Sequence, residues 1–179
     1  MKNLLILISL SLLTCCKKGT TNPANNNSGT YSFEYTFKGQ KYSWSGAKPF
    51  ANNVGAGASF TTDLKITLVR DAPNTTNYYP IVSISVPNTG TGQFELDENT
   101  GKITPQNPYP SVCGIQLGVA TVFSNVYVSG NGKGKVTVKI TEINQGSGGH
   151  VKGSFSGTLC NLDGVAEPIT GSFDAYRLF

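Results

Sequence analysis

Apolar and polar residues alternate most clearly near the C-terminal end of the chain. Alternate positions of residues 151–159 carry Val, Gly, Phe, Gly and Leu, and alternate positions of residues 169–175 carry Ile, Gly, Phe and Ala. A period of two is typical of a β-strand with one buried face. Asn161-Leu-Asp-Gly164 between the two runs has the composition of a turn. The pattern predicts a β-hairpin, and the tripeptide Gly-Ser-Phe occurs once in each of its strands, at Gly153 and Gly171.

Alternating or β-branched segments also occupy much of the chain before this hairpin. They span residues 30–45 (an aromatic hairpin that turns at Lys38-Gly39-Gln40), 59–70, 81–86, 93–96, 112–123, 125–129 and 133–144. Together with the C-terminal hairpin they make about nine to eleven short strands, at the spacing of a sandwich or barrel. We therefore expect an all-β fold, an antiparallel β-sandwich, with a lipocalin-like β-barrel as the alternative. Gly153, Gly157 and Gly171 on the inward faces would either leave room for a ligand in such a barrel or allow close packing of the sheets.

Length, composition and charge further restrict the fold class and the kind of partner. The chain of 179 residues suits a single domain, and its low charged content of 13% with 21 glycines favours a turn-rich β protein. The net charge is +4. Lys133, Lys135 and Lys139 share one strand face, opposite Val136 and Val138, which predicts a solvated sheet face. No basic patch of the kind that binds nucleic acid stands out, so we expect no nucleic-acid partner.

The N-terminal segment has the pattern of an export signal. Lys2 precedes an apolar run, Leu4–Leu13, which is too short to span a bilayer. The sequence Leu12-Leu-Thr-Cys-Cys-Lys-Lys18 follows, and here the chain resembles bacterial lipoproteins, whose lipobox places Leu three residues before the lipidated Cys. Both Cys16 and Cys15 fit this spacing, and we expect Cys16, with Cys15 as the alternative. An ordinary secretory signal with incidental cysteines is the other interpretation.

The lipoprotein resemblance implies cleavage before the lipidated Cys and its acylation, palmitate being a typical acyl group. Residues 1–15 would form the signal peptide, and residues 16–29, which lack large apolar side chains, would form a flexible tether. Residues 30–179 would form a single β-domain. The implied location is the bacterial cell envelope, anchored by lipid to the outer membrane, on a face that the sequence leaves open.

A second resemblance covers about residues 30–179. An aromatic first strand, a Gly-Thr-Gly-x-Phe segment at 90–94, a Gly-Lys-Val-Thr-Val strand at 134–138 and the two Gly-Ser-Phe copies occur in this order. The arrangement is similar to that of a family of small β-domain lipoproteins of unknown function in Gram-negative bacteria. That family implies an anchored β-domain, and it brings no catalytic residues to this chain.

The candidates for covalent or metal chemistry are few. Cys113 and Cys160 could form a disulfide in an envelope compartment, or remain as buried thiols. His150, the single histidine, lies in a Gly-rich turn with no sequence signature that links it to a nucleophile. Asp97-Glu98-Asn99 lacks EF-hand spacing and predicts a turn. We expect no metal, no cofactor and no enzymatic activity.

Aromatic residues near turns and loops are the remaining candidates for binding. Tyr78, Tyr79, Tyr109 and Trp44 could contact a glycan or a protein, although strand packing is the simpler role for Trp44. The leading interpretation is a lipid-anchored, non-enzymatic binding module for a glycan or an envelope protein. A lipocalin-like carrier of a small apolar ligand and a structural subunit of an envelope complex are the alternatives.

Overall fold

A computed structural model describes residues 29–47, 55–69, 80–87, 90–102, 105, 111–117, 126–130 and 132–178. Within these ranges the chain forms eleven β-strands and no helix, which confirms the predicted all-β fold. The strands are β1 (Tyr31–Phe37), β2 (Gln40–Gly46), β3 (Gly55–Phe60), β4 (Asp63–Val69), β5 (Pro80–Pro87), β6 (Gly92–Leu96), β7 (Val112–Leu117), β8 (Val126–Val128), β9 (Lys135–Ile143), β10 (His150–Cys160) and β11 (Ala166–Arg177).

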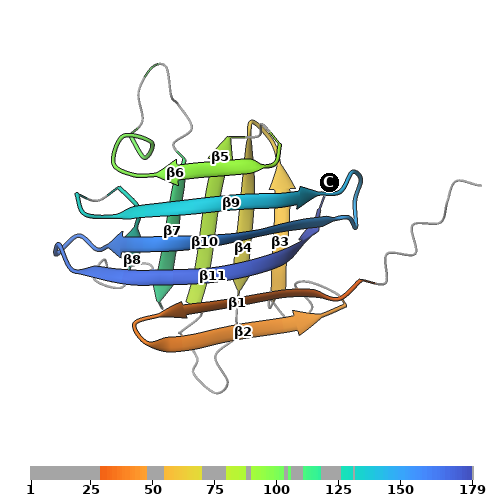
Figure 1. Cartoon of the computed structure of the whole chain (residues 1–179), viewed down its shortest axis with the longest axis horizontal. Helices are drawn as coiled ribbons and strands as arrows, with labels where there is room; N and C mark the ends of the chain where they lie inside the picture. Colours follow the sequence, from red (N-terminus) through yellow and green to blue (C-terminus); the bar gives the residue numbers. More distant parts are fainter. Residues whose placement is uncertain are drawn as a thin grey trace, which may run out of the picture.

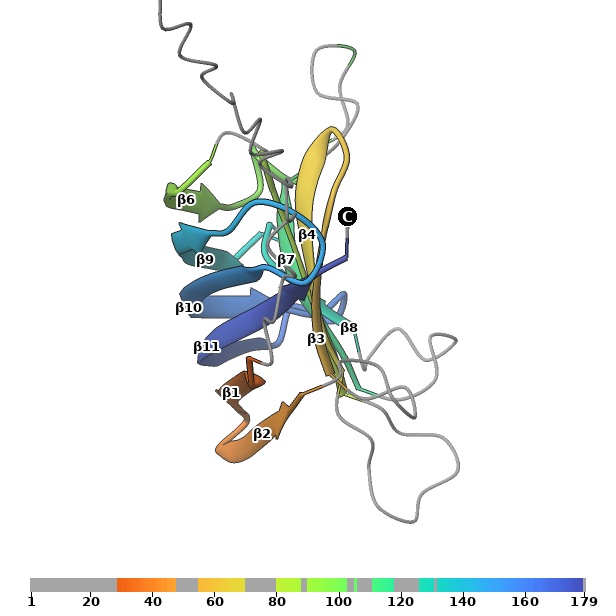
Figure 2. The ribbon, with the colours of Figure 1, turned by 90° about the vertical axis from the view of Figure 1, so that its right-hand side faces the viewer.

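The strands lie in two layers that cross one another (Figures 1 and 2). One layer has the order β2-β1-β11-β10-β9-β6, and the other has the order β3-β4-β5-β7-β8. The layers join twice. Tyr176 and Arg177 of β11 run parallel to β3, and Cys160 of β10 pairs with Val128 of β8. Apart from the β11–β3 join, every pairing between the described strands is antiparallel, including that of β10 with β8. Because the joins link both layers into one mixed sheet, strand order alone assigns neither the sandwich nor the barrel.

The hydrophobic core lies between the two layers and follows from the alternation in the sequence. Along β1, for example, Tyr31, Phe33, Tyr35 and Phe37 are buried, whereas the residues between them are more exposed. The same alternation buries Val136, Val138 and Ile140 of β9 and leaves Lys133, Lys135 and Lys139 exposed, as the sequence predicts. Removing these apolar surfaces from water is the main stabilising contribution.

The two Gly-Ser-Phe copies lie directly opposite each other. In the β10–β11 register Gly153 pairs with Phe173, Ser154 with Ser172 and Phe155 with Gly171. A Cβ atom on Gly171 would come within 2.7 Å of the Phe155 ring, and one on Gly153 within 2.6 Å of the Phe173 ring. Each ring therefore covers the glycine of the other copy, so at these two positions the glycines allow close packing.

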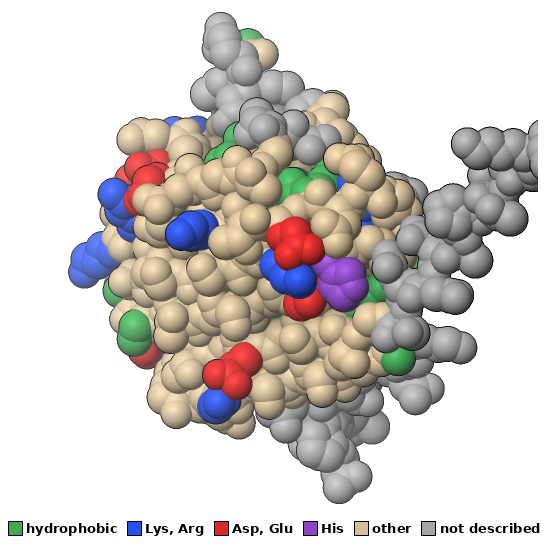
Figure 3. All heavy atoms as spheres, turned by 45° about the vertical axis from the view of Figure 1, so that its right-hand side comes forward, with side chains coloured by type: hydrophobic (Ala, Val, Ile, Leu, Met, Phe, Trp, Pro, Cys, Tyr) green, Lys and Arg blue, Asp and Glu red, His purple; other side chains and the backbone are tan. Residues whose placement is uncertain are grey.

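The outward face of the six-stranded layer is polar, and most of its charges lie in pairs. Glu34 is 2.8 Å from Lys41, Glu142 is 2.9 Å from Lys152, and Glu95 is 3.4 Å from Lys135. Between these pairs the face is covered mostly by uncharged side chains and backbone, with an isolated basic side chain among them (Figure 3). Because this face is solvated, apolar and polar residues alternate along its strands, whereas a sheet buried on both faces would have continuous apolar runs.

Candidate functional site

Most of the residues proposed from the sequence for binding or lipidation lie outside the described residues. These are Cys15, Cys16, Tyr78, Tyr79 and Tyr109. Trp44 lies on β2, where its half-buried ring stacks on Phe33 with the ring centroids 6.2 Å apart. A Cβ atom on Gly46 would lie 2.8 Å from the Trp44 ring. Trp44 therefore belongs to the aromatic packing of the first hairpin, which was the simpler of its two predicted roles.

Cys113 and Cys160 are brought to neighbouring parts of the fold but are not joined. Both are buried, free thiols, so the predicted bridge is not formed in this structure. Strand β8 pairs with β7 on one side and with β10 on the other, and it therefore lies between the strands that carry the two cysteines. The Cys160 thiol is instead within 3.5 Å of the carbonyl oxygen of Asn161, to which it donates.

Burial also makes the Cys113 thiol unreactive. Removal from water raises the pKa of Cys113 to about 12, so almost no thiolate is present at pH 8. We expect a chain that starts at Gly29 to react with a maleimide at neither cysteine when folded and at both after unfolding in guanidinium without a reductant. Mass spectrometry counts the adducts. An unfolded chain that takes up no maleimide until a reductant is added would instead establish the Cys113–Cys160 disulfide.

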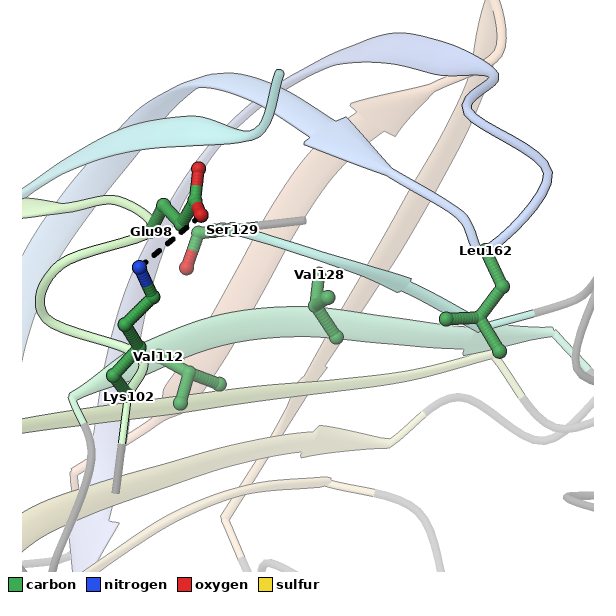
Figure 4. Close-up of a pocket in the computed structure, with 8 residues that line it drawn as sticks. Glu98, Lys102, Val112, Val128, Ser129 and Leu162 are labelled. Atoms are coloured by element: carbon green, nitrogen blue, oxygen red, sulfur yellow. Dashed lines mark ion pairs between the residues drawn. The ribbon is translucent and has the colours of Figure 1, made fainter. Parts of the chain in front are cut away.

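A pocket of about 390 Å³ opens near the join between β8 and β10 (Figure 4). Val112 and Val128 lie in its middle, Leu162 lies at one end, and the ion pair between Glu98 and Lys102 lies at the other, with Nζ and Oε1 3.3 Å apart. The other described residues that line it are Gly101, Ser129 and Gly130. The volume lies near the lower end of the range for small-molecule pockets, about 300–1,000 Å³.

A tight turn at residues 97–101 forms one wall of this pocket. The carboxylate of Asp97 accepts the backbone N–H groups of Asn99 at 2.9 Å and Thr100 at 3.1 Å, and the Gly101 N–H donates to the Asp97 carbonyl at 3.0 Å. The N–H groups of Thr100 and Asn99 hold the pKa of Asp97 below its usual range. The predicted Asp97-Glu98-Asn99 turn is thus confirmed, and it fixes Glu98 at the rim.

The β10–β11 turn forms the opposite wall, and one buried side chain holds it. The side-chain oxygen of Asn161 accepts the Val165 N–H at 2.8 Å, and the backbone of Asn161 bonds to Val165 and Gly164 at 3.0 and 3.1 Å. Asn161 is itself only 3% exposed, whereas Leu162 beside it is 66% exposed. The turn therefore presents a large apolar side chain to solvent from a rigid backbone.

The pocket offers an apolar floor with one ammonium and one carboxylate at its rim. Such a surface can hold an aliphatic group and can orient a polar group next to it. The sequence predicts both turns but does not predict that they lie close together, because their proximity depends on the pairing of β8 with β7 and β10. The sequence feature that points to this pocket is Leu162, a large apolar residue inside a turn of polar composition.

A second polar cluster surrounds His150, where the fold brings together residues that no sequence motif connects. Its Nδ1 atom is 2.6 Å from an oxygen of Asp174, and its ring stacks on Tyr31 with the centroids 4.7 Å apart. Figure 3 shows the histidine beside acidic and basic side chains. Among the described residues, the backbone of Gly29 lies against the other ring nitrogen, Nε2, and a Cβ atom there would be 2.4 Å away.

This arrangement supplies a base and an orienting carboxylate, which are two parts of a nucleophilic triad. In a triad Nε2 must meet a hydroxyl or a thiol. In the part of the chain that the structure describes, Gly29, which has no side chain, lies against Nε2. The Tyr31 hydroxyl donates to the Gly148 carbonyl at 2.8 Å, and burial, followed by the nearby Tyr176 and Asp174, raises the pKa of Tyr31. The cluster thus ties the start of the domain to the β9–β10 turn.

No protein-family model matches this chain, and comparisons with curated proteins and with solved structures find no match either. The described residues contain no group of three or more His, Cys, Asp or Glu side chains placed to hold a metal ion. In that same part of the chain no helix has the length and hydropathy needed to cross a bilayer. Inference about function therefore starts from the N-terminal sequence pattern and the geometry of the β-domain.

Proposed function

We propose that the chain is a lipid-anchored protein of the bacterial cell envelope whose β-domain is a non-enzymatic binding module. The lipobox-like pattern that ends at Cys16, the polar residues 17–29 and the first strand at Tyr31 support this order of anchor, tether and domain. The similarity of residues 30–179 to small β-domain lipoproteins supports the same assignment.

The pocket between the two tight turns is the observation that carries the binding role. Its walls are fixed by hydrogen bonds to Asp97 and Asn161 before any partner arrives, which lowers the entropic cost of binding. Its described lining is aliphatic in the middle, where Val112 and Val128 lie. A protein partner that inserts an apolar side chain next to Leu162 fits such a surface.

The geometry around His150 supports a role other than catalysis. The backbone of Gly29 lies where a triad would place its nucleophile, and the His150–Asp174 pair connects neighbouring strands of the sheet. A contact of this kind holds the domain start in place without the need for a substrate.

The anchor is tested by metabolic labelling with an alkyne analogue of a fatty acid, followed by detection of the labelled protein. We expect the wild-type chain and the Cys15→Ser variant to carry the label and to sediment with membranes. The Cys16→Ser variant should lose the label and leave the membrane fraction. The reverse result for the two variants would move the lipidation site to Cys15, and an unlabelled wild-type chain would contradict the anchor.

The binding surface is tested with a photo-crosslinking amino acid placed at Leu162 of the full chain in cells. We expect at least ten times more of a discrete adduct from position 162 than from Ser154, which is exposed at the middle of the six-stranded layer. Position 165, in the same turn but outside the pocket lining, should give an intermediate yield. Equal yields at positions 162 and 154 would contradict a binding role for the pocket.

A further inference from the structure

Strand β2 forms an open edge of the six-stranded layer (Figure 1). Among the described residues it pairs with β1 and with no other strand. The hairpin turns through two residues, Lys38 and Gly39, so its closing pair, Phe37 and Gln40, is a hydrogen-bonded pair. Hydrogen bonding to β1 then alternates along β2. The backbone N–H and C=O groups at positions 41, 43 and 45 therefore point away from β1, toward the open edge.

Half-buried aromatic side chains lie on the inward face of the same edge. Tyr42 stacks on Tyr35 with the centroids 4.9 Å apart, and Trp44 stacks on Phe33 at 6.2 Å. These two side chains are the outermost members of the aromatic rows that begin in the core. The edge therefore combines a row of outward backbone groups with apolar surface that is only partly covered.

The opposite edge of the layer, strand β6, carries one half-buried aromatic side chain, Phe94, where β2 carries two. Strand β6 has five residues where β2 has seven. Its Glu95 accepts a hydrogen bond from Thr137 at 2.7 Å and forms an ion pair with Lys135 at 3.4 Å. A short strand with a charged residue is a common way to discourage edge pairing. Strand β2 also carries a charged residue, Lys41, but it is longer and presents two half-buried rings, so of the two edges it is better suited to strand addition.

We propose that a second copy of this chain pairs with the open edge through its own β2, antiparallel and centred on Ser43. In an antiparallel pair, residues whose backbone groups point outward must face residues that do the same. The sequence satisfies this condition when Ser43 lies opposite Ser43 of the second copy. Lys41 then faces Ser45 of the second copy, so no like charges meet, and Lys41 keeps its ion pair with Glu34 at 2.8 Å.

The same register joins the aromatic rows of the two copies. Tyr42 lies opposite Trp44 of the second copy, and the reverse pair forms by symmetry, so both half-buried rings gain a covering neighbour. Because the contact is two-fold symmetric, it uses the β2 edge of both copies and closes at a dimer. The inference depends on neither the lipid anchor nor the pocket beside Leu162.

The test uses the full chain in cells, with Ser43→Cys as a reporter and mild oxidation before non-reducing electrophoresis. Residues opposite one another in a hydrogen-bonded antiparallel pair have Cα atoms about 5.5 Å apart, within the span of a disulfide. We expect a band of twice the chain mass at least ten times stronger than that from Ser154→Cys, a position that is also exposed but lies on β10, away from the edge. Equal yields from the two variants would overturn the proposal, and a Ser43→Cys adduct of another mass would assign the edge to a different protein.

The register and its dependence on the backbone are tested by co-expressing Lys41→Cys chains with Ser45→Cys chains. The mixed dimer should form, because these positions face each other. Adding Ser43→Pro to both chains removes the central outward N–H donor and should reduce the mixed dimer at least tenfold, whereas Ser43→Ala keeps the donor and should leave the yield unchanged. A dimer that survives Ser43→Pro as well as Ser43→Ala would refute pairing through β2.

Discussion

Replacing Phe155 with Ala is expected to lower the free energy of unfolding by about 4 kcal/mol, within the usual range for a buried aromatic ring. The ring is 2% exposed and covers Gly171, a residue that has no side chain with which to fill the space left behind. For a domain of this size the loss corresponds to a fall in melting temperature of roughly 10 °C. Urea denaturation of a chain that starts at Gly29, followed through the fluorescence of the single Trp, measures the change.

The matched control for Phe155 lies next to it in the same tripeptide. Ser154 is exposed on the polar face, so Ser154→Ala should change the stability by less than about 0.5 kcal/mol. Phe173→Ala should resemble Phe155→Ala, because the Phe173 ring covers Gly153 in the reciprocal position. If Phe155→Ala were as mild as Ser154→Ala, the two Gly-Ser-Phe copies would not lie opposite each other in the folded domain.

The local fold could be predicted wherever alternation and a turn motif occur together. The runs on either side of Asn161-Leu-Asp-Gly164 give the β10–β11 hairpin, and Lys38-Gly39 gives the β1–β2 hairpin, because neighbouring strands that share a tight turn must pair. The sequence also places the β9 lysines on the solvent face, since one buried face fixes the orientation of the whole strand.

Contacts between distant strands could not be predicted in the same way. The parallel join of Tyr176 with Gly57 and the pairing of Cys160 with Val128 depend on how the layers cross, and no local pattern encodes that. The pocket beside Leu162 depends on the second of these joins. The His150–Asp174 contact, in contrast, could have been predicted. Asp174 lies diagonally opposite His150 across the predicted hairpin, so the register of that hairpin suggests the contact.

Of the glycines of β10, Gly157 is the one at which a side chain would be tolerated least. Gly157→Ala is expected to destabilise the domain by about 4 kcal/mol, from crowding and backbone strain together. A Cβ atom there would lie 2.1 Å from the carbonyl oxygen of Lys135 and 2.7 Å from the Cα atom of Val136, both in the backbone of β9. Backbone atoms in a paired strand cannot move aside as a flexible side chain can. The φ angle of 153° at this position is also one that residues with a side chain rarely adopt.

Gly164→Ala separates crowding from backbone strain in this prediction. Gly164 has a positive φ of 78°, but a Cβ atom there would have no neighbour within 4 Å. Its replacement should therefore cost about 1–2 kcal/mol, through the backbone alone. If urea denaturation gives Gly157→Ala the same small loss as Gly164→Ala, then β9 does not approach Gly157 closely. A much larger loss at Gly157 means that this glycine is required because β9 packs directly against the backbone of β10, and that ligand space is not the reason for its presence.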